Sequence, residues 1–154
     1  MNDSAVSDAC LTLIRKHEGF RSKPYRCPAG VPTIGYGSTA YADGTPVRMS
    51  DAPITQRQAE QLLRATLLGY EVAVRDCVRV PLSQSQFDAL VSFAYNAGPQ
   101  ALRGSTLLRK LNQADYAGAA SEFGRWVNGD GKRLPGLVRR RADERQLFVD
   151  GMTT

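Results

Sequence analysis

Histidine and cysteine are scarce in this chain. Its 154 residues include one histidine, His17, and three irregularly spaced cysteines, Cys10, Cys27 and Cys77. An odd, irregular set of cysteines does not fit a disulfide framework or a zinc site. One histidine also argues against a conventional metal centre and against Ser-His or Cys-His catalysis, so we expect no metal and no cofactor. His17 is the one candidate histidine base, and a structural role at a helix end is the commoner alternative.

Long apolar runs are missing as well. No stretch of 18 apolar residues occurs, which predicts that the chain has no membrane span and no stable membrane insertion. Residues 1–8 carry neither the basic start nor the apolar core of a secretory leader. We therefore expect the protein to accumulate in the cytoplasm of the cell that makes it.

Acidic residues are outnumbered by basic ones, 15 to 20, which gives a net charge of +5 and a pI of about 9.4. A positive field attracts polyanions, and both nucleic acid and an anionic bacterial wall qualify. The basic residues are dispersed except at 132–133 and 139–141. No basic patch is interleaved with aromatic residues, as single-strand binders require, so we expect no nucleic-acid partner.

Periodicity and capping signals predict a mostly helical chain. A length of 154 residues suits one domain, residues 1–154, that can divide into two lobes. Thr55 with Gln58 and Ser83 with Gln86 are capping-box pairs. Apolar residues at helical spacing predict helices at about 7–17, 55–76, 83–96, 105–111, 115–123 and 135–148.

Glycine and proline gather between the first two predicted helices. Short extended pieces fit around residues 25–26, 32–36 and 46–49, with a tight turn at Asp43-Gly44. Residues 128–132 are expected to form a loop. The fold class is therefore α+β and mostly helical. A small lobe with an antiparallel sheet at about 19–55 is joined by a long helix to a helical lobe at about 77–150, which includes the N-terminal helix.

Three reactive side chains lie within residues 17–38. Glu18 ends the first predicted helix, where the helix dipole disfavours a carboxylate, so an arginine partner is expected. The alternative for Glu18 is a solvated helix-end acid. Cys27 is a thiol in a turn, and its alternative role is that of a small buried apolar residue. Thr33 adds a hydroxyl.

The spacing of Glu18, Cys27 and Thr33, with eight and then five residues between them, resembles the phage T4-type lysozymes, the endolysin or muramidase family. The run Thr33-Ile34-Gly35-Tyr36-Gly37 is similar to that family too. Further similar stretches follow in order at residues 86–98, 105–108, 125–126 and 135–141, so the resemblance covers about residues 7 to 150. One departure is that many members carry aspartate where this chain has Cys27.

The resemblance implies a lysozyme-like two-lobed domain that hydrolyses the β-1,4 linkage between N-acetylmuramic acid and N-acetylglucosamine in peptidoglycan. It makes Glu18 the general acid and places Thr33 beside the attacking water. Cys27 then acts either as a base, which inverts the anomeric centre, or as a nucleophile, which retains it. Substrate-binding residues are expected at the following positions: Tyr36, Asn96, Arg139 and Arg140. The two arginines are also the candidates to pair with Glu18, although a run of arginines is usually a solvated face.

The same resemblance implies partners and a route. The partner is peptidoglycan, the protein is a monomer, and a holin releases it from the host cytoplasm to the periplasm or cell wall. Two alternatives remain open. The chain is either a non-catalytic wall-binding protein that lost activity through Cys27, or a cationic membrane-disrupting antibacterial protein that acts through its C-terminal helix.

Overall fold

The computed structural model describes residues 5–153, so the expectation about a leader falls partly on residues 1–4, outside the described part. The chain forms two compact units. One comprises Ile14–Gly69, and the other comprises Met1–Leu13 with Tyr70–Thr154. Two helices, α1 (Asp8–Glu18) and α2 (Gln56–Cys77), each run from one unit into the other.

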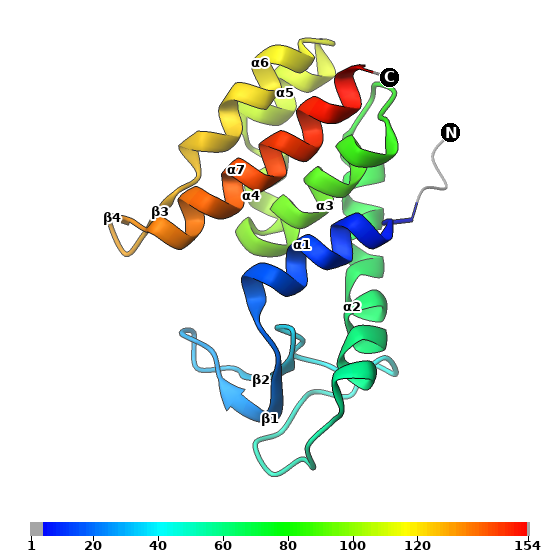
Figure 1. Cartoon of the computed structure of the whole chain (residues 1–154), viewed down its shortest axis with the longest axis vertical. Helices are drawn as coiled ribbons and strands as arrows, with labels where there is room; N and C mark the ends of the chain where they lie inside the picture. The colour runs from blue at the N-terminus through cyan, green and yellow to red at the C-terminus, as the bar shows by residue number, and fades with distance from the viewer. Residues whose placement is uncertain (1–4, 154) are drawn as a thin grey trace. The chain divides into compact units, whose positions relative to one another are not determined.

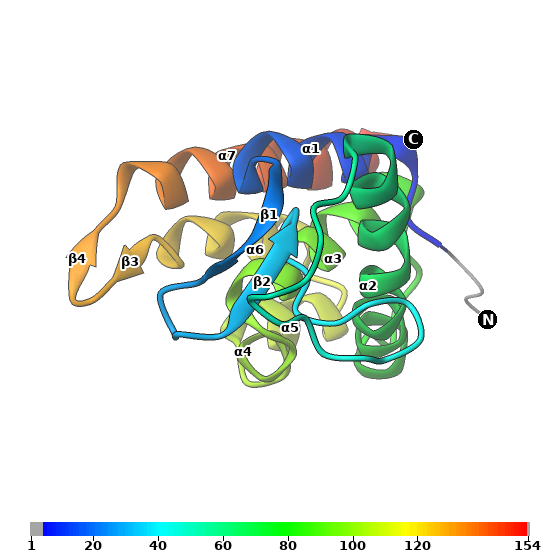
Figure 2. The same ribbon diagram turned by 90° about the horizontal axis from the view of Figure 1, so that it is seen from below.

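The Ile14–Gly69 unit contains an antiparallel hairpin. Its strands are β1 (Arg21–Arg26) and β2 (Pro32–Gly35), and Figure 2 shows them side by side. A small core in this unit joins Ile34 of β2 with Val47 and Leu62, which are all less than a tenth exposed. Both faces of β2 are covered at this point, since Thr33, Ile34 and Gly35 are all buried.

The strand predicted at residues 46–49 is wrong. The backbone there makes only an isolated bridge between Ala40 and Pro46, supported by a hydrogen bond from Val47 N to Thr39 O at 2.9 Å. Proline has no N–H to donate, so a ladder cannot continue through Pro46. The tight turn predicted before it is confirmed, because Gly44 N donates to Tyr41 O at 2.9 Å.

The long helix α2 begins as its capping box predicts. Thr55 N donates to Gln58 Oε1 at 2.8 Å, and Gln58 N donates to Thr55 Oγ1 at 3.1 Å. These two bonds satisfy backbone groups that the first turn of a helix leaves free. The helix then continues to Cys77, close to the predicted end.

The larger unit is helical and is built around α3 (Gln84–Ala97) and α7 (Pro135–Asp150), which pack along each other (Figure 1). Residues 86–94 of α3 are all buried. The predicted capping box at Ser83 and Gln86 is present, and Ser105 and Asp115 cap α5 (Thr106–Asn112) and α6 (Tyr116–Glu122). The mostly helical α+β class with a small antiparallel sheet is thereby confirmed.

Aromatic rings fill the centre of this unit. Phe93 of α3 meets Phe123, which begins the 3-10 helix η1 (Phe123–Arg125), edge to face at 5.8 Å between ring centroids. Phe93 also meets Trp126 in the same manner at 5.4 Å. Such pairs contribute about 0.5–1.5 kcal/mol beyond burial, so the single tryptophan, which is half-buried, packs against the core of the helical unit.

Two short elements depart from the sequence prediction. Helix α4 (Pro99–Arg103) starts at the proline that ends the preceding helix, since proline suits a first helical position. The expected loop at 128–132 is a hairpin of β3 (Asn128–Gly129) and β4 (Lys132–Arg133). Its two turn residues, Asp130 and Gly131, have φ values of 52° and 74°, which an Asp-Gly turn accommodates. A short 3-10 helix, η2 (Gly151–Thr153), follows α7.

Candidate active site

The seven predicted site residues divide between the two units, and each group is described within its own unit. Glu18, Cys27, Thr33 and Tyr36 belong to the Ile14–Gly69 unit. Glu18 is the last residue of α1 and is half-buried. The helix closes directly after it, because Gly19 N donates to Arg15 O at 3.1 Å and Gly19 takes a φ of 74° that favours glycine.

Cys27 opens the turn between β1 and β2. Its backbone N–H donates to Val31 O at 3.0 Å, and its carbonyl accepts from Gly30 N at 2.7 Å. Arg26 adds a bond from Nη1 to Gly30 O at 2.9 Å. The turn is therefore closed on both sides of the cysteine, and the half-buried thiol is held at the end of the hairpin.

This turn makes Cys27 more acidic than an ordinary thiol. Hydrogen bonding to the backbone at Val31 is the main cause of its lowered pKa, and the Ala29 backbone and the Thr33 hydroxyl lower it further. Thr33 is 2% exposed, and its single hydroxyl hydrogen is shared between two acceptors, Val31 O at 2.8 Å and the Cys27 sulfur. The structure thus brings Cys27 and Thr33 together, with backbone amides arranged around the sulfur.

Tyr25 connects Glu18 to Cys27, and it was not among the predicted site residues. Burial raises the pKa of the Tyr25 phenol, the negative charge of Glu18 raises it further, and Cys27 adds a smaller increase. The Arg21 guanidinium, 4.3 Å from the centre of the Tyr25 ring, lowers the pKa. Tyr25 thus feels the charge of both groups and stays a neutral hydrogen-bonding phenol at neutral pH. The available signal in the sequence was the position of Tyr25, two residues before Cys27.

Tyr36 lies in the interior of its unit rather than on the surface. It is 3% exposed, and its hydroxyl accepts from Gln56 Nε2 at 3.1 Å. Its ring lies 5.8 Å from that of Phe20, which is exposed. A direct contact of Tyr36 with substrate stays a prediction.

Asn96, Arg139 and Arg140 belong to the helical unit. Asn96 is exposed in the last turn of α3, and its Oδ1 accepts from Arg141 Nη2 at 2.5 Å. Arg139 is exposed in the first turns of α7 and lines a cavity of about 350 Å³ together with Arg133. The predicted pairing of Glu18 with Arg139 or Arg140 stays a prediction.

The expectation of a solvated run of arginines is wrong for two of the three. Arg140 is 3% exposed and Arg141 1%, because both pair with the fully buried carboxylate of Glu144. Arg140 Nε lies 3.2 Å from Glu144 Oε2, and Ser92 Oγ donates to the same oxygen at 2.6 Å. Glu144 stands three and four residues after the arginines, which is the spacing of helical ion pairs. That spacing was the overlooked signal in the sequence.

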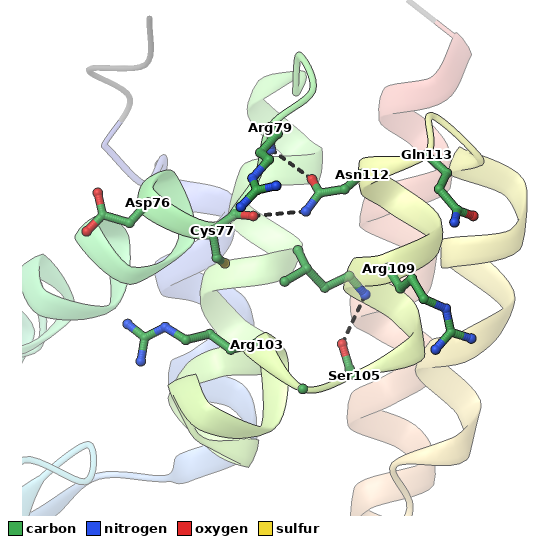
Figure 3. A pocket seen from close by; sticks show the side chains of 10 residues that line it. Asp76, Cys77, Arg79, Arg103, Ser105, Arg109, Asn112 and Gln113 are labelled. Atoms are coloured by element: carbon green, nitrogen blue, oxygen red, sulfur yellow. Dashed lines mark hydrogen bonds between the residues drawn. The ribbon is translucent and has the colours of Figure 1, made fainter.

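A second cavity of the helical unit is rimmed by arginines. The cavity has a volume of about 700 Å³ and is lined by Arg79, Arg103 and Arg109. Figure 3 shows that the three arginines come from different segments of the chain. Asn112 closes one wall by accepting from Arg79 N at 2.8 Å and donating to Cys77 O at 3.0 Å. None of the predicted site residues lines this cavity.

The other two thiols differ from Cys27. Burial is the main reason that the pKa of Cys10 is raised, and Cys10 donates to Asp88 O at 3.4 Å inside the helical unit. Burial also raises the pKa of the half-buried Cys77. Among the described residues, therefore, Cys27 is the thiol whose surroundings favour the thiolate.

Within residues 5–153, no three histidine, cysteine, aspartate or glutamate side chains gather as metal ligands would. Over the same residues, every helix is too short or too polar to cross a membrane. The chemistry of the hairpin thus has to be derived from its carboxylate, thiol, hydroxyl and phenol.

Comparisons with known proteins identify relatives of this chain. A family model described as "Phage lysozyme" matches residues 15–144. The endolysin of Acyrthosiphon pisum secondary endosymbiont phage 1 is 43% identical over 147 residues, which cover 93% of this chain and 97% of the relative. The endolysin of Salmonella phage P22 is 42% identical over 144 residues, or 94% and 97%.

A solved structure gives the same result. The endolysin from Escherichia coli O157:H7 phage FAHEc1 superimposes with a TM-score of 0.86 at 37% identity. The match covers 97% of this chain and 96% of that one. The likeness therefore extends over both units rather than over a shared motif alone.

Proposed function

The chain belongs to the phage lysozyme family, and from this premise we propose that Glu18 and Cys27 are the catalytic pair of an endolysin. The protein is a lysozyme-type glycoside hydrolase. It cleaves the β-1,4 linkage between N-acetylmuramic acid and N-acetylglucosamine in bacterial peptidoglycan and so lyses the host cell. The reaction needs an acid for the leaving oxygen and a second group for the anomeric carbon or its water.

Glu18 is the proposed general acid. Its position at the last residue of α1 holds the carboxyl on a rigid element. Protonation of the leaving oxygen by a positioned acid contributes about 10²–10⁴-fold to the rate. Tyr25, a neutral phenol close enough to feel the Glu18 charge, is suited to orient the carboxyl by hydrogen bonding.

Cys27 is the proposed partner, in one of two roles. As a thiolate it takes a proton from water, which then attacks and inverts the anomeric centre. Otherwise its sulfur attacks the anomeric carbon directly while Glu18 protonates the departing oxygen. Water then hydrolyses the thioglycoside, with retention. The lowered pKa of Cys27 supports both roles, because each requires the thiolate.

Thr33 is proposed to orient the attacking water or a sugar hydroxyl. Its hydroxyl lies beside Cys27 and carries no charge of its own. The substrate contacts proposed for Tyr36, Asn96, Arg139 and Arg140 come from the family resemblance. Arg140, which is buried, pairs with Glu144 and donates to Ser92 O, so it is better suited to hold α7 in place than to touch a sugar.

One observation carries the assignment. The Tyr25 phenol responds to the charges of both Glu18 and Cys27, although the two come from a helix end and a strand end. Glu18 and Cys27 therefore both lie close enough to the Tyr25 phenol for their charges to raise its pKa. Two-group glycoside hydrolysis needs an acid and a second group near one bond, and the shared neighbour supports Glu18 and Cys27 as that pair.

The test is a turbidity assay on permeabilised Gram-negative cells with Glu18→Gln. This variant keeps the shape of the side chain and removes its transferable proton, so lysis should fall by about 10²-fold or more. Glu60→Gln is the matched control, because Glu60 is a surface carboxylate of the same unit, paired with Arg15 at 3.8 Å. Such a pair contributes at most about 1 kcal/mol. Wild-type lysis by folded Glu18→Gln would overturn the assignment.

The proposal extends to route and partners. We propose that the protein stays in the host cytoplasm until a holin opens the membrane, and that it then acts as a monomer on the wall from the periplasmic side. Peptidoglycan is its polymer partner, and its positive charge acts on the anionic wall rather than on nucleic acid.

The two other functions are less well supported. A membrane-disrupting C-terminal helix would need its cationic and apolar side chains free to meet lipid, whereas Arg140, Arg141 and Phe148 of α7 are buried. A wall-binding protein without activity has no need of a thiol with a lowered pKa at the end of the hairpin.

A further inference from the structure

Asn96 and Arg141 form a short hydrogen bond inside the helical unit. Arg141 Nη2 donates to Asn96 Oδ1 at 2.5 Å, from the first half of α7 to the last turn of α3. Arg141 is 1% exposed, whereas Asn96 is exposed. One end of this contact is thus fixed in the interior and the other reaches the surface.

Arg141 is held firmly by its surroundings. Its Nε lies 3.0 Å from Oε1 of the fully buried Glu144, and its guanidinium carbon lies 5.0 Å from the centre of the Phe93 ring. The charge of Glu144 and the face of the Phe93 ring restrict how far this planar guanidinium can rotate. The Nη2 atom that reaches Asn96 is therefore directed by the helical core.

The orientation of the Asn96 amide follows from this contact. A guanidinium only donates hydrogen bonds, so the amide atom that faces Arg141 must be the oxygen. The amide nitrogen Nδ2 then faces away from Arg141. The protein thereby presents two N–H donors at an exposed position. The positive charge behind the amide oxygen polarises the group and strengthens them.

We propose that Arg141 is a positioning residue that fixes Asn96 with its NH₂ directed to the carbonyl oxygen of an acetamido group in peptidoglycan. The inference rests on the proposed function, because it takes the wall glycan as the ligand. An acetamido carbonyl accepts hydrogen bonds and has no acidic proton, so it matches an NH₂ whose oxygen is already occupied. Both sugars of the wall disaccharide carry this group.

Asn96→Asp is the sharpest variant. An aspartate keeps the size of the side chain and pairs with Arg141 as an ion pair, so the fold should be at least as stable. It replaces the outward donors by an acceptor, which would face the acetamido oxygen and repel it. We expect KM for the wall to rise about tenfold, which corresponds to one lost hydrogen bond of ordinary strength, with a smaller change in kcat.

Gln100→Glu is the matched control. Gln100 is an exposed amide of α4, four residues farther along, and its substitution adds the same negative charge to the helical unit. KM should change less than twofold in this variant. An equal rise in both variants would mean that added charge alone weakens wall binding, and this result would overturn the proposal.

Arg141→Lys tests the positioning itself. Lysine keeps the positive charge for Glu144 and lacks the planar fork, so the amide of Asn96 becomes free to flip. Asn96→Ala should then raise KM for the wall about tenfold in the wild-type protein and less than twofold in the Arg141→Lys background. If Arg141→Lys does not fold, the Asn96→Asp comparison still decides the proposal. Equal costs in the two backgrounds would show that Arg141 does not act through Asn96.

A binding measurement separates this inference from the proposed function. The inactive Glu18→Gln protein is titrated with the tetrasaccharide of N-acetylglucosamine and with its deacetylated counterpart. Adding Asn96→Ala should raise the Kd of the acetylated tetrasaccharide about tenfold and change the Kd of the deacetylated one less than twofold. If wild type does not hydrolyse walls, the proposed function fails regardless of this titration. If Asn96→Ala weakens both sugars equally, or neither, the acetamido contact is wrong even in an active enzyme.

Discussion

Thr33 lies directly opposite Tyr25 in the β1–β2 ladder, and both side chains interact with Cys27. Thr33 supports the thiolate through its hydroxyl, and Tyr25 feels the charges of Cys27 and Glu18. A cross-strand pair at the end of a short hairpin thus organises the chemistry of this unit. Predictions for Cys27 and for Thr33 follow from it.

The first prediction concerns the order in which the thiols react. Cys27 should be alkylated by iodoacetamide before Cys10 and Cys77, because its pKa is lowered and burial raises the pKa of the other two. Mass spectrometry of partly labelled protein measures the order. Lysis should disappear in step with the labelling of Cys27, and a fully labelled Cys27 with unchanged lysis would exclude a catalytic thiol.

The second prediction concerns pH. A base or nucleophile works in its thiolate form, so activity should rise with pH through the pKa of Cys27. That rise should come at a lower pH than the pKa of a free thiol, because hydrogen bonding to the backbone lowers the pKa of Cys27. In Cys27→Asp the rise should move several pH units lower, toward the aspartate value of about 3.9, while activity near neutral pH persists. A profile that keeps its alkaline rise in Cys27→Asp would assign the rise to another group.

The third prediction separates the hydroxyl of Thr33 from its methyl group. Thr33→Ser keeps the hydroxyl that supports Cys27 and should retain much of the activity. Thr33→Val keeps the shape and should lose most of it, with a pKa of Cys27 closer to that of a free thiol. The lysis rate and the pH dependence of alkylation measure the two effects. Equal activity of both variants would make Thr33 a packing residue.

The helices and their caps could be predicted because their signals are local. Thr55 with Gln58 and Ser83 with Gln86 bond as their spacing requires. The strand predicted at 46–49 failed for a local reason too, namely the missing N–H of Pro46. Asp130-Gly131 is a recognisable hairpin-turn sequence, but the strands on either side, Asn128–Gly129 and Lys132–Arg133, are too short to be predicted.

The candidate site could be predicted only as a set of residues. The motif named Glu18, Cys27 and Thr33, but the backbone hydrogen bond that lowers the pKa of Cys27 exists only once the turn at 27–31 has closed. The burial of Arg140 and Arg141 depends on how α7 packs against α3, which charge counts do not reveal. The direction of the Asn96 amide depends on the same packing.

The fourth prediction tests that buried cluster. Glu144→Gln removes the negative charge that pairs with two buried guanidinium groups, those of Arg140 and Arg141. Breaking a buried pair in this way costs about 3–5 kcal/mol. Urea unfolding of the full chain measures the loss, and Glu60→Gln, at an exposed pair, serves as the control. A loss below about 1 kcal/mol would mean that water reaches the cluster.

The most direct test of the account identifies the new reducing ends. Purified peptidoglycan is digested with wild type, Glu18→Gln and Cys27→Ala, and the ends are reduced with borohydride and analysed. The account predicts that wild type releases reducing-end N-acetylmuramic acid and that both variants, correctly folded, release almost none. Reducing-end N-acetylglucosamine from wild type, or wild-type amounts of muramic acid ends from either variant, would contradict it.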